Sequence, residues 1–420
     1  MSTAFKSADI LIPQNVDMEK WAVVACDQYT GQPDYWKRVE ETVGEADSTL
    51  KLILPEVYLE ETDSAKRIEA IHEEMNRILG TNTLKEYKNA MVYIERVQSD
   101  GKVRQGLIGM LDLEEYDYHK GSTSQVRATE ATVVERIPPR IKVRQGAPLE
   151  LPHIMILIDD ELKSVVEPCA EIKNKTKPVY DFKLMENGGK ICGYILDEAL
   201  KSSVFNALDT LNDNELFNKK YNLNGYPTLL YAMGDGNHSL ATAKEFYEQL
   251  KRENPDKDLS QHPARYALVE IVNLHSNALE FEAIHRIVTN VNTDELMSEM
   301  TEILGLSNEK SEQSFDIILN GTQKTVYIHK PTSQLTVGSL QEFLDAYLNK
   351  TDAKIDYIHG IDVVKSLAEQ ENSIGFILPD MKKSELFPTV IKDGALPRKT
   401  FSMGHAEDKR FYIECRKIKE

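Results

Sequence analysis

The stretch YAMGDGNHSLATAK, residues 231–244, changes its hydrophobic pattern in the middle. The apolar run YPTLLYAM, which ends at Met233, is typical of a buried strand. Beyond Gly234 and Gly236, apolar residues recur at helical spacing, at Leu240, Ala243, Phe246, Tyr247 and Leu250. The stretch therefore predicts a strand, a short loop and a helix of about three turns.

The segments around this stretch alternate between helical and strand patterns. Residues 62–80 predict an amphipathic helix, and the two runs that flank Asp100-Gly101 predict a hairpin. LPHIMILIDD and ARYALVEIVNL are typical of strands, TDELMSEMTEIL of a helix capped by Thr293, and RFYIECRKI of a final strand. The predicted fold class is therefore mixed α and β (α+β).

The sequence contains no internal repeat and no Gly/Ser-rich linker, so composition marks no domain boundary. We expect an N-terminal α+β region over 1–150 and a motif-bearing core region over 151–290. A smaller α+β subdomain or insertion is expected over 291–380, and a C-terminal segment over 381–420 that returns to the core.

Composition restricts the classes of partner. The 420 residues carry a net charge of −18 with a pI near 5.1, which opposes nucleic-acid binding. The chain shows neither a signal peptide nor an apolar run that could span a membrane, so we expect a cytoplasmic protein. The four cysteines are scattered and predict reduced thiols. A small-molecule substrate is the expected partner, and a homo-oligomer is compatible with the sequence.

The residues between the predicted strand and helix suit a phosphate. Gly234 and Gly236 allow close approach of the backbone, and the helix N-terminus favours negative charge. Asn237 and Ser239 are good N-cap residues, His238 adds a donor or proton carrier, and Asp235 can accept a hydroxyl proton or bind Mg²⁺. The same residue types also serve turn chemistry alone, and spacing does not separate the two interpretations.

Basic residues gather in VRATEATVVERIPPRIKVRQG, residues 126–146, where Arg127 is a candidate anion ligand. Because Arg140, Lys142 and Arg144 alternate with apolar residues, the segment favours the solvated face of an edge strand, with anion binding as the alternative. Glu130 in the same segment is interpreted from the residues alone as a surface acid.

Three further places have open interpretations. Arg398 and Lys399 in GALPRKTFS fit a phosphate contact and an exposed turn equally. His285 and Arg286 in FEAIHRIV favour a satisfied histidine in an apolar strand over a ligand-binding one. Cys26 favours a buried small hydrophobe, and the neighbouring Asp27 is either a turn acid or a functional carboxylate.

Taken together, these motifs resemble the DUF1015 family of uncharacterised bacterial and archaeal proteins. The resemblance lies in GLIGMLDLEEYD, RATEAT, MGDGNHSLATA, AIHRIV, SIGFILPD and LPRKT, in the order of the family. The central family motif is similar to the phosphate loop of the ParB/sulfiredoxin-like superfamily, which includes free-serine kinases. The resemblance implies a ParB/sulfiredoxin-like core elaborated by additional helices and strands.

The resemblance also implies roles for individual residues. Asp235 and Gly236 become part of the active loop, and His238 a contact to phosphate or to the transition state. Glu130 and Thr132 match an acidic segment of the family and become a candidate acid and its hydrogen-bonding neighbour. His285 and Arg286 match a family Thr-His-Arg segment.

The sequence also departs from the family pattern. Asn237, His238 and Ser239 stand where most relatives have His-His-Arg, and Thr129 stands where the acidic segment usually has His. Loss of the Arg removes a charged phosphate donor, a contact of about 1.5–3 kcal/mol, for which Arg127 or Arg398 could substitute.

These observations lead to two hypotheses. The first is a phosphotransferase that uses Mg²⁺ with ATP or ADP, with Asp235 as the candidate protein ligand of the metal, and that phosphorylates the hydroxyl of a small metabolite, with free serine as the preferred acceptor. Asp235 or Glu130 would accept the hydroxyl proton in a direct transfer, and the backbone from Gly236 to Ser239 would bind the phosphates. The alternative is a nucleotide- or metabolite-binding regulatory protein without turnover.

Overall fold

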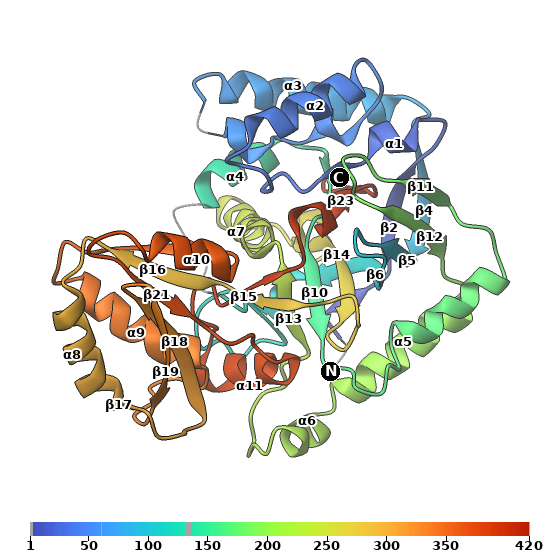
Figure 1. The fold of residues 1–420 in the computed structure, drawn as a ribbon. Helices are drawn as coiled ribbons and strands as arrows, with labels where there is room; N and C mark the ends of the chain where they lie inside the picture. The colour runs from blue at the N-terminus through green and yellow to red at the C-terminus, as the bar shows by residue number, and fades with distance from the viewer. Residues whose placement is uncertain (1–2, 60, 131–136, 420) are drawn as a thin grey trace. The chain divides into compact units, whose positions relative to one another are not determined.

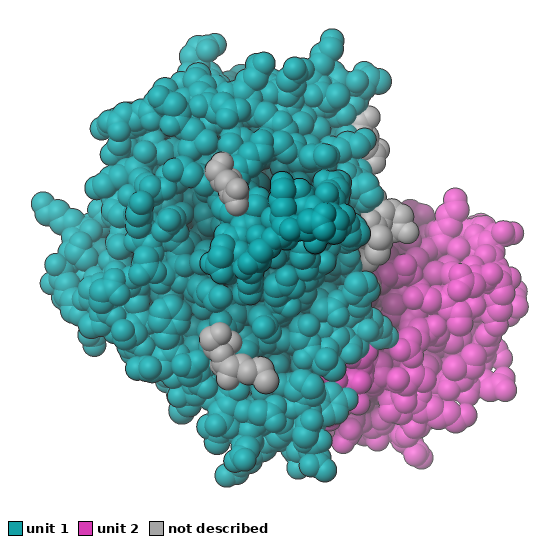
Figure 2. Space-filling model, turned by 180° about the vertical axis from the view of Figure 1, so that it is seen from behind, with its two compact units in different colours: residues 1–128, 132–279, 405–420 teal, residues 129–131, 280–404 magenta. Residues whose placement is uncertain are grey.

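The fold in Figure 1 is a computed structural model that describes residues 3–59, 61–130 and 137–419. It forms two compact units, coloured separately in Figure 2. Unit 1 comprises residues 1–128, 132–279 and 405–420, and unit 2 comprises residues 129–131 and 280–404. Both units combine helices and strands, which confirms the predicted mixed class. Within the described residues, no helix is long and apolar enough to cross a membrane.

Unit 1 is built on a ten-stranded mixed sheet, counted over the described residues. β14 and β10 pair in parallel, as do β13 with β8 and β8 with β7, while the other pairs are antiparallel. The strands, in sheet order, are β11 (Tyr180–Lys183), β12 (Lys190–Ile195), β5 (Val92–Val97), β6 (Val103–Asp112), β14 (Tyr266–Asn273), β10 (Met155–Ile158), β13 (Tyr231–Asp235), β8 (Val126–Arg127) and β7 (Tyr116–Asp117), with β1 (Phe5–Lys6) beside β6.

Both faces of this sheet are covered. Side chains alternate along a strand, so Val92 and Ile94 belong to one core and Tyr93 to the other. The first core includes apolar residues of α2 (Pro33–Val43) and α3 (Ser64–Gly80). The second includes those of α5 (Glu198–Leu211) and α7 (Asn237–Glu253). The predicted helix over 62–80 and the hairpin around Asp100-Gly101 are confirmed by α3 and by β5 with β6.

Short elements complete unit 1. The remaining α-helices of unit 1 are α1 (Met18–Trp21), α4 (Ile137–Arg144) and α6 (Asn214–Lys220). Three further strand pairs are β2 (Ala8–Pro13) with β4 (Leu84–Ala90), β3 (Val23–Val24) with β23 (Phe411–Tyr412), and β9 (Leu149–Glu150) with β24 (Arg416–Lys417). The single final strand expected from RFYIECRKI is therefore wrong. The segment pairs at β23 and β24 with two different partners, because each two-residue strand meets a different part of unit 1.

The edge strand expected around Arg140, Lys142 and Arg144 is also wrong, because these residues lie in α4. An alternating pattern of five residues fits a strand, but the two prolines before Arg140 occupy the first turn of α4, where their missing amide hydrogens are not needed. The two arginine charges are paired rather than solvated, whereas Lys142 is exposed. Arg140 Nε lies 2.9 Å from Glu56 Oε1, and Arg144 Nη2 lies 2.6 Å from Glu150 Oε2.

Unit 2 contains a six-stranded antiparallel sheet, counted over the described residues. In sheet order its strands are β17 (Leu306–Ser307), β19 (Thr322–Ile328), β18 (Gln313–Leu319), β21 (Ile374–Ile377), β16 (His285–Thr289) and β20 (Lys354–Ile358). Its helices are α8 (Thr293–Leu304), α9 (Thr336–Leu348), α10 (Ile361–Leu367) and α11 (Lys383–Asp393), and β15 (Phe281–Ala283) pairs with β22 (Phe401–Met403). The cap of α8 is Asn292, whose side chain accepts from Glu295 N, and not the expected Thr293.

Candidate functional site

The predicted strand–loop–helix joins β13 to α7 in unit 1. β13 ends at Asp235, and Gly236 follows with a φ of 77°, a conformation that side chains rarely adopt. A Cβ at Gly236 would lie 3.0 Å from the backbone Cα of Ile154. Glycine at this position therefore allows both the turn and the close approach to the segment before β10.

The N-terminus of α7 favours a negative ligand. Its first turn closes with the bond from Leu240 N to Gly236 O at 3.0 Å, and no side chain of the described residues caps the helix. The helix dipole adds partial positive charge there. Asn237 Oδ1 is buried and has no hydrogen-bond partner within the described part of the chain, so this acceptor suits a donor or a cation on a ligand. The carbonyl of His238 accepts from Thr242 Oγ1 at 2.7 Å.

A lysine from the C-terminal segment supplies a cation beside the loop. Lys409 Nζ lies 3.3 Å from Asp235 Oδ2, and Asp235 Oδ1 accepts from Gly236 N at 2.9 Å. The backbone of this segment is fixed by Arg96, whose guanidinium donates to Lys409 O at 3.0 Å and to Glu407 O at 2.7 Å. Sequence reasoning missed Lys409, because no local pattern links it to a loop so far away in the chain.

Ser239 and a histidine from the segment before β10 form a hydrogen-bonded pair. Ser239 Oγ lies 2.8 Å from His153 Nε2, and His153 Nδ1 lies 2.7 Å from the hydroxyl of Tyr412. That hydroxyl also accepts from Cys26 N at 3.1 Å. His153 and Tyr412 are both buried, so these contacts form away from water. Neither residue was recognised from the sequence, which offers no motif around them.

Asp27 lies at the same place. Its Oδ2 is 4.0 Å from His153 Nε2. Burial raises the pKa of this carboxyl, but the charge of His153, a hydrogen bond from Gln28 and the charge of Lys409 together hold the pKa below its usual value. Asp27 is therefore a carboxylate that stays ionised beside an imidazole and an ammonium group.

A cavity of about 150 Å³ adjoins the Ser239–His153 pair. Ser239, His153, Tyr412 and Cys26 contribute to its wall. Most of the remaining wall is apolar and comes from Leu52, Ile53, Leu54, Leu59, Met75, Val143, Leu149, Leu151 and Leu268. The arginines of α4 that line it already have carboxylate partners in Glu56 and Glu150. The cavity can therefore hold a small ligand beside Ser239.

Arg127, one of the two cations expected to replace the missing family arginine, is engaged with the backbone. Its Nε donates to Ser124 O at 2.8 Å, and its Nη2 donates to Pro227 O at 2.9 Å. Burial lowers its pKa to about 10. These bonds place Arg127 at the start of β13, whereas the motif loop follows the end of that strand.

Other predicted residues form a group within unit 2. Glu130 pairs with Leu396 in a parallel bridge. Burial is the main cause that lowers the pKa of Arg286, to about 10, and the charge of Glu130 is among those that oppose this shift. Arg286 Nη2 donates to Arg398 O at 3.0 Å. Both guanidinium groups lie over the ring of Tyr357, at 5.1 Å and 5.7 Å from its centroid. Within unit 2 the structure thus brings Glu130, Arg286 and Arg398 together.

The remaining predicted residues differ in their surroundings. His285 Nδ1 accepts from Leu378 N at 3.2 Å, and burial lowers the pKa of its imidazole. His285 therefore behaves as the satisfied strand histidine favoured from its context. Lys399 is exposed and has a φ of 54°, which is unusual for a residue with a side chain. Thr132 lies outside the described residues.

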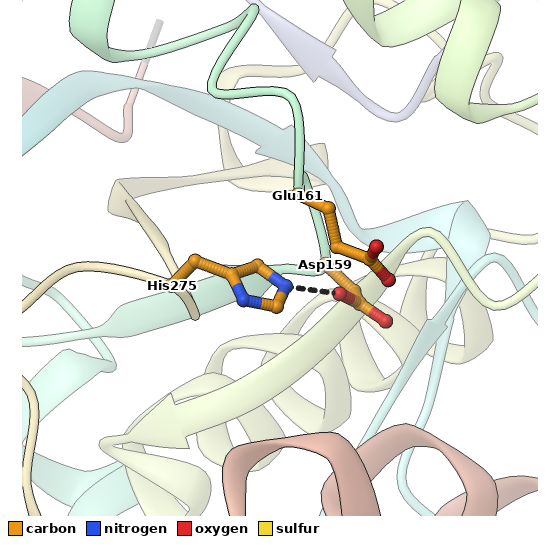
Figure 3. Close-up of side chains that lie close together, drawn as sticks. All are labelled: Asp159, Glu161 and His275. Atoms are coloured by element: carbon orange, nitrogen blue, oxygen red, sulfur yellow. Dashed lines mark hydrogen bonds and ion pairs between the residues drawn. The ribbon is translucent and has the colours of Figure 1, made fainter.

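One group of metal-ligand side chains occurs in the described residues, at the other end of β10 from the loop. Figure 3 shows Asp159, Glu161 and His275, whose ligand atoms all lie within 4.8 Å of one another. His275 Nε2 is 2.6 Å from Asp159 Oδ1. Lys220 Nζ lies 3.0 Å from Asp159 Oδ2 and 3.2 Å from Glu161 Oε1, so one ammonium group already pairs with both carboxylates.

The family follows from the sequence itself. The sequence profile of the family described as "Protein of unknown function (DUF1015)" matches residues 11–347. The chain belongs to this family. Among curated proteins, none matches this DUF1015 chain.

Solved structures similar to this DUF1015 chain are distant in sequence. A conserved hypothetical protein from Pyrococcus furiosus has a TM-score of 0.35 and 11% identity, over 74% of this chain and 95% of its own. A free serine kinase in complex with AMP has a TM-score of 0.37 and 11% identity, over 74% and 91% of the two chains. A free serine kinase variant in complex with ADP has a TM-score of 0.37 and 11% identity, over 76% and 93%.

Proposed function

We propose that unit 1 binds the phosphates of a nucleotide at residues 236–239 and transfers the terminal phosphoryl group to the hydroxyl of a small metabolite. The observation that supports this most is Lys409, whose ammonium lies 3.3 Å from Asp235 beside a helix N-terminus that no described side chain caps. Phosphoryl transfer depends on positioning and on neutralising negative charge, and backbone amides together with a fixed cation supply both.

Mg²⁺ that arrives with the nucleotide fits the residues at this loop. Mg²⁺ prefers oxygen ligands, takes one or two from the protein, and keeps water and phosphate oxygens for the rest. The carboxylate of Asp235 and the buried, unpartnered Oδ1 of Asn237 are such ligands. The ion would neutralise charge on the transferred group.

The acceptor would lie in the cavity beside Ser239, with its hydroxyl toward the loop. Asp27 is the carboxylate that we assign to accept the hydroxyl proton, because Lys409 forms its direct ion pair with Asp235 and Asp27 lies 4.0 Å from His153 Nε2. Free serine is the first acceptor to test, since the loop resembles that of free-serine kinases. The cavity wall is mostly apolar, so alcohols with larger carbon skeletons belong in the same panel.

The departure at Ser239 favours a second candidate, in which the same contacts bind a nucleotide for regulation without turnover. Ser239 stands where the resemblance to the family motif implies an arginine that would contact phosphate. A regulator would share the binding behaviour described next and differ only in forming no product.

Replacing Gly236 by Ala should weaken nucleotide binding. A side chain at this backbone conformation costs about 1–2 kcal/mol, and the added Cβ would also press on the backbone of Ile154. The loop must move to relieve both, so we expect affinity for ATP or ADP with Mg²⁺ to fall about 10-fold or more. Isothermal titration calorimetry measures this directly.

The matched control is Gly225→Ala, in the segment that leads into β13. Gly225 also has a positive φ, of 68°, but a Cβ there would meet no atom within 4 Å. This control should lose a similar amount of stability and keep wild-type affinity. Absence of nucleotide binding by the wild-type protein, or equal affinity in both variants, would count against the proposed site.

A further inference from the structure

Ser239 has the surroundings of a reactive hydroxyl. Its Oγ lies 2.8 Å from Nε2 of the buried His153, at hydrogen-bonding distance. Ser239 is the third residue of α7, at the helix end where the proposed nucleotide phosphates bind. It also contributes to the wall of the cavity, so its hydroxyl can meet a bound ligand.

The hydrogen bonds around His153 are compatible with a proton on Nδ1. The Tyr412 oxygen accepts from Cys26 N at 3.1 Å and can accept in the same way from His153 Nδ1, 2.7 Å away. In the tautomer that carries its proton on Nδ1, Nε2 accepts the Ser239 hydroxyl proton.

A carboxylate stabilises the cation that would form. When His153 takes the serine proton, its imidazolium faces Asp27 Oδ2 at 4.0 Å. A hydroxyl, a neutral imidazole fixed by its other nitrogen, and a nearby carboxylate are the parts of an activated nucleophile.

We propose that Ser239 is a phosphoryl carrier, phosphorylated by the bound nucleotide with His153 as general base and discharged to the acceptor. This inference rests on the proposed function and replaces the direct transfer expected from the sequence by two successive transfers.

Each transfer balances without a further reactant. In the first, Ser239 Oγ bonds to the terminal phosphorus, the bond from that phosphorus to the bridging oxygen breaks, and His153 Nε2 takes the hydroxyl proton. The nucleotide leaves with one phosphate fewer. In the second, the acceptor oxygen bonds to phosphorus, the Oγ–P bond breaks, and Oγ recovers the proton from His153. The acceptor proton passes to Asp27 and then to solvent.

The test is intact-protein mass spectrometry of the full chain, acid-quenched at increasing times after mixing with Mg²⁺ and either ATP or ADP, without acceptor. We expect the mass to rise by one phosphoryl group, with peptide mapping placing it on Ser239. Ser239→Ala should abolish the gain, and His153→Gln should slow it about 100-fold or more. Ser202→Ala, a serine on the exposed side of α5 bonded to Glu198 O, should match the wild type.

The second measurement is a chase with the hydroxyl acceptor, run beside product formation by Ser239→Ala. Discharge of phosphoserine together with formation of the phosphorylated acceptor would establish the carrier. Phosphate on another residue, or phosphoserine that the acceptor never discharges, would overturn it. Product formed equally by the wild type and Ser239→Ala would overturn the carrier and leave the proposed function intact. Neither phosphoprotein nor product in the wild type would remove both.

Discussion

Lys409→Met should lower kcat/KM for phosphoryl transfer by about 10- to 150-fold. The estimate follows from losing one charged hydrogen-bonding contact to phosphate, about 1.5–3 kcal/mol. The backbone at 409 should keep its place, because Arg96 holds it through carbonyl oxygens that the substitution leaves intact. Steady-state kinetics with either nucleotide, together with calorimetric affinities, would show the loss.

Two variants make this result interpretable. Lys409→Arg keeps the positive charge and should recover part of the activity. Lys417→Met removes a lysine from the same C-terminal segment, where its Nζ forms an exposed pair with Glu86 Oε1 at 3.0 Å, and it should behave as wild type. Wild-type kinetics for Lys409→Met would show that the Lys409–Asp235 pair is only structural.

Glu270→Gln should destabilise the protein by about 3–5 kcal/mol, because it removes the negative charge from a buried ion-pair network. Of the two arginines that pair with Glu270, only Arg410 has a second carboxylate partner among the described residues, Glu414. Glu270 is fully buried on β14, with Arg104 Nε 3.1 Å from Oε1 and Arg410 Nη1 3.3 Å from Oε2. On the adjacent strand β6, a Cβ at Gly106 would lie 2.5 Å from Glu270 Oε1. The sheet thus has room for the carboxylate only because residue 106 is glycine.

The arginines that pair with Glu270 also hold part of the candidate site in place. Arg104 Nη1 donates to Asp408 O at 2.9 Å, and Arg410 Nη2 lies 2.7 Å from Glu414 Oε2, so the network fixes the segment that carries Lys409 and Tyr412. Urea unfolding would measure the free energy of unfolding, with Glu86→Gln as the exposed-pair control, expected below about 1 kcal/mol. A loss for Glu270→Gln no larger than that of the control would mean that the buried arginines do not depend on this carboxylate.

Local patterns account for what the sequence predicted well. The loop between β13 and α7 is recognisable because its glycines separate an apolar strand pattern from a helical one. Both patterns extend over several residues. The segment around Arg140 was misassigned because five alternating residues fit a strand and a short helix alike. Its helical form is stabilised by Glu56 and Glu150, whose proximity no local pattern reveals.

Local sequence patterns identify only part of the candidate site. Asp235 and Ser239 were identified as candidates, but the groups that give them chemical meaning come from elsewhere in the chain. Lys409 pairs with Asp235, and His153 pairs with Ser239. Each of these partners is a lone polar residue in its own segment, so only the folded arrangement of the sheet and the C-terminal segment reveals it.

The most direct test of phosphoryl transfer is phosphorus NMR of the purified protein with Mg²⁺ and either ATP or ADP. L-serine is the first acceptor, followed by a panel of small hydroxyl-bearing metabolites that includes more apolar alcohols. We expect a phosphomonoester signal that grows with time until it exceeds the protein concentration and that, when the acceptor is omitted, is limited to at most the phosphoserine of the protein. Spectra that stay unchanged with both nucleotides and every acceptor would contradict it and favour the regulatory protein without turnover.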